Sequence, residues 1–308
     1  MAADNEVYHE PVLVKEVVEL FDKAETILDC TLGGGGHSAA LLAAGARVTA
    51  IDRDPEAIAA ARSRLAAEEA AGRFGIILGN FAEADRLLPD SSQKFDGVLA
   101  DLGVSSHQID DESRGFSFRE GAPLDMRMGN GGDSAATLLN TADEQELARI
   151  FFEYGDEPRS RRLAREVVRR RENRPFVTSD DLVGAIRAVL GSRSGAGDFA
   201  RMFQAVRIAV NDELRSLETA LPVLRDRLAR GGILAVISYH SGEDRMVKHA
   251  MREWSRDCIC PPRQLKCTCG GKAGGGLVTR KAVTAAVEEV SRNPRARSAR
   301  LRAWRREG

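Results

Sequence analysis

Short apolar runs alternate with longer helical patterns over the first hundred residues. The second helical pattern begins where Asp54 suits an N-cap and Pro55 suits a first helical position. Because parallel strands joined by helices produce this alternation, we expect a parallel sheet covered on both faces. The runs that indicate strands are Thr26–Thr31, Arg47–Asp52, Phe74–Leu78 and Phe95–Asp101.

The alternation stops after Asp101, and from Ser106 to about Arg215 the apolar residues recur at helical spacing. In the first of these helices, Thr141 and Glu144 suit a capping box. The segments with helical spacing are Thr141–Tyr154, Ser160–Arg171, Ser179–Leu190 and Ala200–Leu214.

A strand pattern returns at Gly231–Ser238, and the segments Leu277–Thr279 and Ser298–Trp304 can close the sheet edge. We therefore predict a discontinuous α/β domain formed by residues 1–105 and 216–308. Residues 106–215 form an inserted all-helical domain of ordinary domain size.

Composition places the chain among ordinary globular proteins, with 308 residues, 43% hydrophobic and 30% charged. The net charge of −1 means that any surface for nucleic acid must be local. No apolar run is long enough to cross a bilayer, and the first residues do not suit a signal peptide. These features predict a cytoplasmic protein that does not bind membranes.

Four of the five cysteines fall between Cys258 and Cys269, which is not the spread of a disulfide framework. Cys258, Cys260, Cys267 and Cys269 form two C-x-C pairs, a tighter spacing than zinc sites usually have. We expect no metal, and the spacing alone leaves zinc open.

The segment Asp29–His37 carries four consecutive glycines after the first predicted strand. Glycines there let a ligand approach the backbone, and the next helix offers N–H groups that need partners. Asp52 ends the second strand nineteen residues after Gly33, where a carboxylate can accept hydrogen bonds from ribose hydroxyls. Together they favour a cofactor that contains adenosine.

The glycine loop fits S-adenosylmethionine better than a nicotinamide dinucleotide. Ser38 and Ala39 stand where the last glycine of G-x-G-x-x-G would fall. The alternative pattern D-x-G-x-G-x-G matches at Asp29, Gly33 and Gly35, with Thr31 replacing its first glycine.

Several longer motifs show that the whole chain resembles the bacterial 16S ribosomal RNA cytosine-N4 methyltransferases. They run in order from residue 9 to the C-terminus, and those in the insertion are the most specific. The motifs are the segments 29–38, 101–106, 114–118, 123–128, 203–208, 210–214, 238–245 and 293–298.

The resemblance implies a Rossmann-like S-adenosylmethionine methyltransferase sheet with an inserted helical domain. It also implies methyl transfer to N4 of a cytosine in the decoding region of small-subunit ribosomal RNA. A nicotinamide dehydrogenase would not account for the motifs of the insertion. A non-catalytic assembly factor would need only the arginine clusters.

The resemblance assigns cofactor binding to seven residues: Gly35, Gly36, His37, Asp52, Phe81, Asp101 and Gln108. Phe81 follows the third strand, where a ring can pack on adenine or simply belong to the core. Relatives often have a larger residue at Gly34 and phenylalanine at Tyr239.

Asp101 is also the candidate catalytic residue. A carboxylate at the end of the fourth strand can bind the cofactor's ammonium group, or accept a hydrogen bond from the cytosine amine and make its nitrogen more nucleophilic. Main-chain carbonyls of residues 102–105 are the alternative acceptors. Methylation at carbon 5 would need a cysteine nucleophile near this strand end, and the sequence has none there.

RNA contacts are expected from local basic clusters. Arg159–Arg174 has eight arginines against two glutamates, the usual composition of a solvated helix face. Arg292–Arg306 has seven arginines and no acid, and we expect few carboxylates to pair with them. The residues expected to contact RNA are His240, Arg245, Lys248, Arg295 and Arg297. The sequence leaves open which nucleotide is methylated and whether the substrate is free RNA or the assembled small subunit. It also leaves open whether the protein forms a homodimer.

Overall fold

The computed structural model describes residues 11–90, 92–258, 260, 264, 266, 268 and 271–307. The chain divides into two compact units, which are considered separately below. One unit combines Met1–Gly103 with Ser216–Gly308, and the other is Val104–Arg215.

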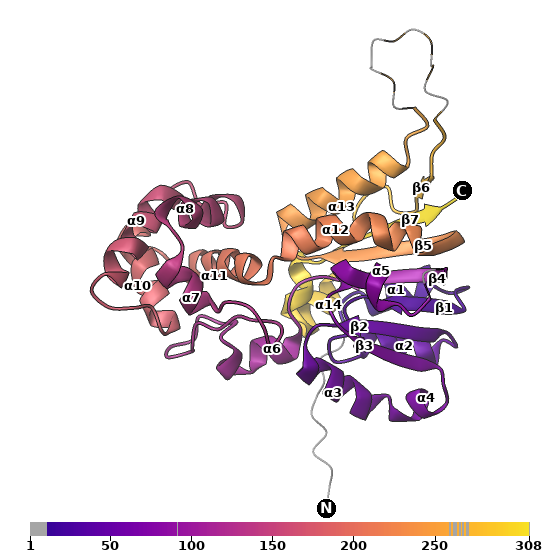
Figure 1. The fold of residues 1–308 in the computed structure, drawn as a ribbon, viewed down its shortest axis with the longest axis horizontal. Coiled ribbons are helices and arrows are strands. Elements are labelled where there is room, and N and C mark those ends of the chain that lie inside the picture. Colours follow the sequence, from indigo (N-terminus) through magenta and orange to yellow (C-terminus); the bar gives the residue numbers. More distant parts are fainter. Residues whose placement is uncertain are drawn as a thin grey trace, which may run out of the picture. The chain divides into compact units, whose positions relative to one another are not determined.

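A seven-stranded sheet forms the centre of the first unit, in the order β3-β2-β1-β4-β5-β7-β6 (Figure 1). The first five strands are parallel, whereas β7 pairs antiparallel with β5 and with β6. The strands are β1 Thr26–Asp29, β2 Arg47–Asp52, β3 Phe74–Leu78, β4 Phe95–Asp101, β5 Leu228–Ser238, β6 Gly275–Leu277 and β7 Arg300–Arg306. The predicted α/β class is confirmed, but the sheet is mixed because β7 runs antiparallel to both of its neighbours.

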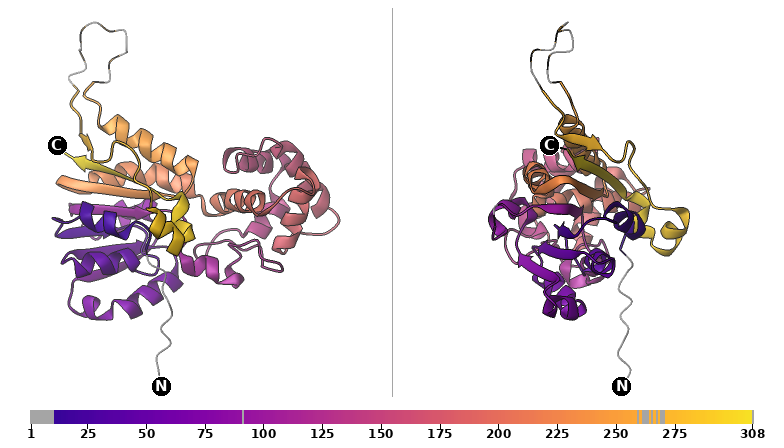
Figure 2. Two further views of the ribbon diagram at one scale, coloured as in Figure 1. Left: turned by 180° about the vertical axis from the view of Figure 1, so that it is seen from behind. Right: turned by 90° about the vertical axis from the view of Figure 1, so that its right-hand side faces the viewer.

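Helices cover both faces of this sheet, as Figure 2 shows from behind and from the side. One buried cluster joins Ile27 of β1 to helices α1 (Val14–Leu20), α2 (Gly36–Ala43) and α3 (Pro55–Arg64). A second cluster joins Leu28 to α5 (Ala84–Leu87), α12 (Glu213–Asp226) and α13 (Ser241–Trp254). Because neighbouring strand residues point to opposite faces and both faces are covered, the buried stretches 27–28 of β1, 98–100 of β4 and 233–237 of β5 are apolar.

The remaining short elements of the first unit are α4 (Ala66–Ala70), η1 (Phe81–Glu83), α14 (Val287–Arg292) and η3 (Pro294–Ser298). The start of α3 is as predicted, since the Asp54 side chain accepts from Glu56 N–H and Pro55 occupies the first helical position.

On β7, Trp304 is fully buried and packs edge-on against Trp254 of α13, with ring centroids 5.3 Å apart. The C-terminal strand is therefore part of the core.

The second unit is helical in the part of the chain that the structure describes. Its helices pack around a separate apolar cluster that includes Leu147, Leu163 and Phe203. They are α6 Ser106–Asp110, η2 Glu112–Arg114, α7 Ala135–Thr141, α8 Glu144–Glu153, α9 Ser160–Arg171, α10 Ser179–Leu190 and α11 Ala196–Asn211. The predicted bounds of α9 and α10 are confirmed.

Two predictions in this unit are wrong. Thr141 ends α7, and the cap of α8 is Asp143, whose carboxylate accepts from Glu146 N–H at 2.7 Å. The helix expected over 200–214 ends at Asn211, because Asp212 adopts a left-handed conformation (φ 50°) and α12 begins at Glu213.

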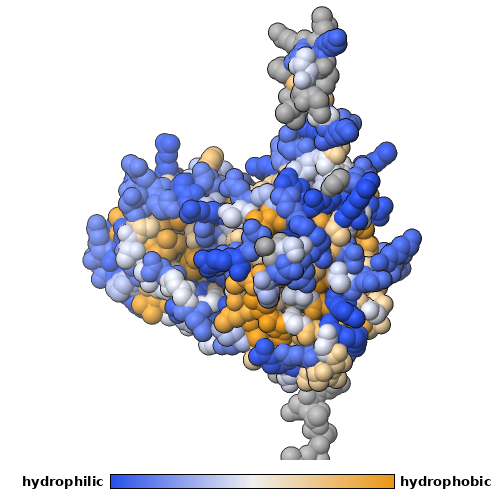
Figure 3. Space-filling model, turned by 45° about the vertical axis from the view of Figure 1, so that its right-hand side comes forward, coloured by the Kyte–Doolittle hydropathy of each residue, from blue (hydrophilic) through white to orange (hydrophobic). Residues whose placement is uncertain are grey.

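The surface view in Figure 3 shows hydrophilic residues interspersed with hydrophobic patches. Among the described residues, the large apolar side chains that are more than half exposed are Leu78, Phe152, Val177 and Val287. In the same part of the chain, every helix is too short or too polar to span a bilayer.

Candidate active site

The glycine loop follows β1 at the edge where the parallel strands end. Gly33 and Gly35 have positive φ angles of 49° and 75°, and Gly35 begins α2 as its N-cap residue. A Cβ on Gly35 would lie 3.2 Å from Ala61 Cβ and 3.3 Å from a Leu65 methyl carbon of the next helical segment. The glycine therefore satisfies both the turn and the close packing of two helical segments.

Asp52, at the end of β2, fixes this loop. One carboxylate oxygen accepts from Gly33 N–H at 2.8 Å and the other from Asp54 N–H at 2.9 Å. Burial raises the pKa of Asp52 to about 6, although these two hydrogen bonds favour the charged form. Each oxygen has a second lone pair, so the carboxylate can still accept from ribose hydroxyls.

Asp29 and Thr31 join the ends of β1 and β4, a connection that sequence reasoning missed. Asp29 is fully buried and accepts from Ser38 Oγ at 2.7 Å and from Thr31 N–H at 3.1 Å. The Thr31 hydroxyl accepts from Asp101 N–H at 2.6 Å. The threonine that replaces the motif glycine thus holds the backbone of Asp101.

Asp101 lies between two side chains at the end of β4. The Tyr239 hydroxyl donates to Asp101 Oδ1 at 2.8 Å, and His37 Nδ1 lies 3.6 Å from Oδ2. Burial raises the pKa of Asp101 to about 6, while the nearby His37 and the Tyr239 hydrogen bond oppose that rise. The Asp101 side chain is 21% exposed, so a ligand can still reach it.

The contact from Tyr239 was not predicted, although β5 pairs directly with β4. Tyr239 is the residue after Ser238, the last residue of β5, and Asp101 is aligned with Ile237 in the parallel pairing. Burial raises the pKa of Tyr239 well above its usual value, and the charge of Asp101 adds to this. The hydroxyl consequently stays protonated and remains a donor.

Phe81 and Gln108 differ in their surroundings. Phe81 begins η1 after β3 and is partly buried against the cluster on the α12 face, which fits an adenine contact and a core role alike. Gln108 belongs to the helical unit, where it is 5% exposed and accepts from Ser105 N–H at 3.0 Å. Gln108 lies within α6.

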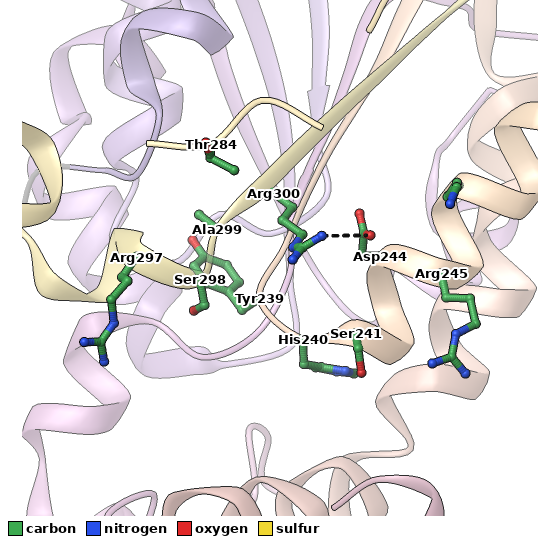
Figure 4. Close-up of a pocket in the computed structure, with 11 residues that line it drawn as sticks. Tyr239, His240, Ser241, Asp244, Arg245, Thr284, Arg297, Ser298, Ala299 and Arg300 are labelled. Atoms are coloured by element: carbon green, nitrogen blue, oxygen red, sulfur yellow. Dashed lines mark ion pairs between the residues drawn. The ribbon is translucent and has the colours of Figure 1, made fainter. Parts of the chain in front are cut away.

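A cavity of about 410 Å³ opens beside the end of β5 (Figure 4). In Figure 4, Arg297 extends from η3 on one side and Arg245 extends from α13 on the other. Three predicted RNA residues from the segment after β5 line it, namely His240, Arg245 and Lys248, together with Arg297. Arg295 also lies in η3 but does not line the cavity.

The cavity is basic because its one carboxylate is already paired. Asp244 accepts from Arg302 at 2.7 and 3.1 Å and lies 3.6 Å from Arg300. Arg245, Lys248 and Arg297 make no ion pair with any described residue and are available to a phosphate.

His240 lines the cavity but has a structural role as well. Its Nδ1 accepts from Glu243 N–H at 3.4 Å as the N-cap of α13, and its side chain is only 9% exposed. The imidazole is thus mostly enclosed by its own helix start.

Both arginine clusters are more engaged within the protein than their composition indicates. In α9, Arg169 and Arg170 pair with Glu166, and Arg171 donates to the carbonyls of Leu139 and Ala142. In the terminal cluster, Arg300 and Arg302 share Asp244. The expectation that the terminal arginines have few carboxylate partners is wrong for these two, because α13 packs beside β7.

No group of three or more potential metal ligands occurs among the described residues. Cys258 and Cys260 are partly exposed thiols, while Cys267 and Cys269 lie outside the described residues. Zinc at the four cysteines stays an open question.

Two relatives align with almost the full length of this chain. Ribosomal RNA small subunit methyltransferase H of Gemmatimonas aurantiaca is 63% identical over 97% of this chain and 95% of its own length. The protein of the same name from Myxococcus xanthus is 48% identical over 96% of each chain. Among solved structures, an rRNA methylase from Streptococcus thermophilus aligns over 96% of this chain and 94% of its own, with 11% identity and a TM-score of 0.42.

A family model described as the MraW methylase family matches residues 6–307. This match and the identities to its relatives confirm the family predicted from the motifs, and the chain belongs to the MraW methylase family.

Proposed function

We propose that this protein uses the carboxyl edge of its sheet to transfer a methyl group from S-adenosylmethionine to N4 of a cytosine in the decoding region of small-subunit ribosomal RNA. The methyl transfer, its cofactor and its ribosomal RNA substrate follow from membership of the family. The assignment of roles to individual residues is our proposal.

The residues of the glycine loop and of the neighbouring strand ends suit S-adenosylmethionine. Asp52 offers carboxylate oxygens to the ribose, and Phe81 offers a ring to adenine. Asp101 is the one carboxylate at the end of β4 and suits the ammonium of the methionine part. When bound, the cofactor supplies a methyl group on a positively charged sulfur.

Gly35, Gly36 and His37 complete the cofactor site on the loop side. Gly35 and Gly36 begin α2, whose first N–H groups face the edge where a carboxylate group would bind. His37 is buried behind them, and Gln108 is included on the family resemblance alone.

The acceptor side needs a group that draws a proton of the cytosine amine. The nitrogen lone pair is delocalised into the ring, so a hydrogen bond to a carboxylate makes it a better nucleophile. Asp101 is our candidate for this role as well. Alignment of the nitrogen, the methyl carbon and the sulfur supplies the rest of the rate acceleration.

The observation that carries the proposal is that Tyr239 connects the basic cavity to Asp101. Its ring lines the basic cavity and its hydroxyl donates to Asp101. The surface suited to RNA phosphates and the carboxylate suited to the reaction therefore share one side chain. We assign RNA binding to Arg245, Lys248 and Arg297, with His240 shaping the cavity and Arg295 at its margin.

The helical unit, residues 106–215 in the predicted division, is assigned to substrate recognition. The substrate is the ribosomal RNA itself or the assembled small subunit. Because bacterial ribosomes are assembled in the cytoplasm, we place the protein there.

Mass spectrometry of small-subunit RNA tests the reaction. RNA from cells that lack this protein should lose one N4 methyl group on a decoding-region cytosine, and the purified protein with S-adenosylmethionine should restore it. An unchanged methylation pattern in those cells would overturn the proposed activity.

Arg297 tests the RNA surface. Arg297→Ala should weaken RNA binding and reduce the slope of log affinity against log salt by about 1, because one phosphate contact is lost. Arg305→Ala is the matched control, since Arg305 is an exposed arginine on β7 that does not line the cavity. Equal effects of the two substitutions would exclude the cavity as the RNA surface.

A further inference from the structure

His37 has a fixed tautomer in this structure. Its Nε2 lies 2.9 Å from the carbonyl oxygen of Val12, and the side chain is 7% exposed. Because a carbonyl only accepts hydrogen bonds, Nε2 must carry a hydrogen. In a neutral imidazole Nδ1 would then hold only a lone pair.

That lone pair would face a negative charge. Nδ1 is 3.6 Å from Asp101 Oδ2, and the other Asp101 oxygen is already bound by the Tyr239 hydroxyl. An unprotonated nitrogen opposite a carboxylate is repulsive in a site with little water, whereas a proton between the two makes the contact attractive.

We infer that the pair formed by His37 Nδ1 and Asp101 Oδ2, which lie 3.6 Å apart, carries one proton, and that the ammonium group of S-adenosylmethionine replaces this proton when the cofactor binds. The inference rests on the proposed assignment of that ammonium to Asp101. An ammonium can donate one hydrogen to the carboxylate and another to the freed Nδ1 lone pair. The displaced proton leaves to the solvent, so charge and atoms balance.

The other ionisable groups around this pair already have hydrogen-bond partners, so they are poorer candidates for holding the displaced proton. Asp29, at the end of β1, has its two oxygens occupied by Ser38 Oγ–H and Thr31 N–H. Glu243, on α13, accepts from the main-chain N–H of Tyr239 at 2.9 Å and lies 3.2 Å from His240 Nε2. Tyr239 already uses its hydrogen toward Asp101. Of these described groups, only His37 and Asp101 face each other without a donor between them.

This gives His37 a role distinct from a simple contact to the cofactor. As a positioning residue it holds Asp101 with a removable proton, so that the site is neutral before the cofactor arrives. The charge of the cofactor then replaces the charge of the proton, and Asp101 has a positively charged partner in either state.

Isothermal titration calorimetry in two buffers with different ionisation enthalpies counts the protons. S-adenosylhomocysteine is the probe, because it keeps the ammonium group and is not consumed. At pH 7 the wild-type protein should release close to one proton for each molecule bound. Adenosine lacks the ammonium group, and its binding should release almost none.

His37→Gln is the matched variant. The glutamine amide can still donate to the Val12 carbonyl, but it cannot carry a titratable proton toward Asp101. The variant should bind S-adenosylhomocysteine without proton release, once its circular dichroism and thermal unfolding match those of the wild type.

The outcomes separate the inference from the proposed function. Wild-type binding of S-adenosylhomocysteine with no proton release would overturn the shared proton and leave the cofactor site intact. If neither probe binds, the cofactor assignment itself is wrong. If His37→Gln does not fold, the wild-type comparison of the two probes still decides the question.

Discussion

The ends of β2 and β4 each carry a buried carboxylate, and burial raises the pKa of both Asp52 and Asp101 to about 6. Their partners differ. Asp52 is held by two backbone N–H groups, at Gly33 and Asp54. Asp101 is held by side chains, the Tyr239 hydroxyl and the His37 imidazole.

We propose that this difference separates a binding group, Asp52, from a reacting one, Asp101. A carboxylate fixed by the main chain keeps one geometry and suits a constant task such as holding a ribose. A carboxylate fixed by side chains can change its proton and its partners within one catalytic cycle. The predictions below test this contrast.

The largest effect is expected at the end of β4. Asp101→Asn keeps the volume and one carbonyl oxygen but removes the charge, and should slow methyl transfer in a single turnover by about a hundredfold at saturating cofactor. Asp96→Asn, at the other end of β4, is the control for loss of a carboxylate on that strand.

The same measurement distinguishes the two roles of Asp101. If the carboxylate only binds the cofactor's ammonium group, the defect will appear in cofactor affinity and vanish at saturation. A wild-type rate in the saturated variant would remove Asp101 from the chemistry and leave the main-chain carbonyls of 102–105 as acceptors.

At the end of β2, Asp52→Ala should weaken cofactor binding by roughly 1.5–3 kcal/mol, the value of hydrogen bonds to a charged acceptor. The single-turnover rate at saturation should change little. Asp54→Ala is the matched control, because it removes a neighbouring carboxylate and a helix cap but no group assigned to the ribose. Calorimetry gives both affinities, and equal losses would refute the ribose assignment.

A change of pH should separate the two carboxylates without mutation. The pKa of Asp52 is raised, so its charged form is lost as the pH falls through about 6. Adenosine affinity should therefore fall about tenfold from pH 7 to pH 5, because only Asp52 is involved. S-adenosylhomocysteine affinity should fall further, since its binding also displaces the proton of the His37–Asp101 pair. Parallel curves for the two ligands would show that Asp101 does not contact the methionine part.

The sequence was sufficient for features that depend on local pattern. The five parallel strands, α9 and α10 were predicted because the apolar spacing that marks each element lies within its own segment. The start of α8 was misplaced because Thr141 and Asp143 are both good caps two residues apart. The break at Asp212 was missed because no glycine or proline marks it.

The candidate site also contains features that follow from local sequence pattern and features that depend on tertiary pairing. The position of Asp52 beside the glycine loop was predictable, because it ends the strand that follows that loop. The Tyr239–Asp101 hydrogen bond joins residues 138 positions apart and depends on the pairing of β4 with β5. The Asp244 pairs with Arg300 and Arg302 likewise depend on how α13 lies beside β7, which composition does not reveal.

The smallest effect is expected from Tyr239→Phe. The ring is kept, so the cavity should persist, and so should the packing at Gly103, where an added Cβ would lie 3.3 Å from the tyrosine ring. Losing the hydroxyl removes a hydrogen bond that favours the charged form of Asp101, so the pKa of Asp101 should rise further. Above pH 8 the single-turnover rate should stay within a few-fold of the wild type, while at pH 6.5 it should drop about three- to fivefold as Asp101 gains a proton. A pH–rate profile of the variant that superimposes on that of the wild type would mean that the group titrating in the reaction is not the carboxylate at the end of β4.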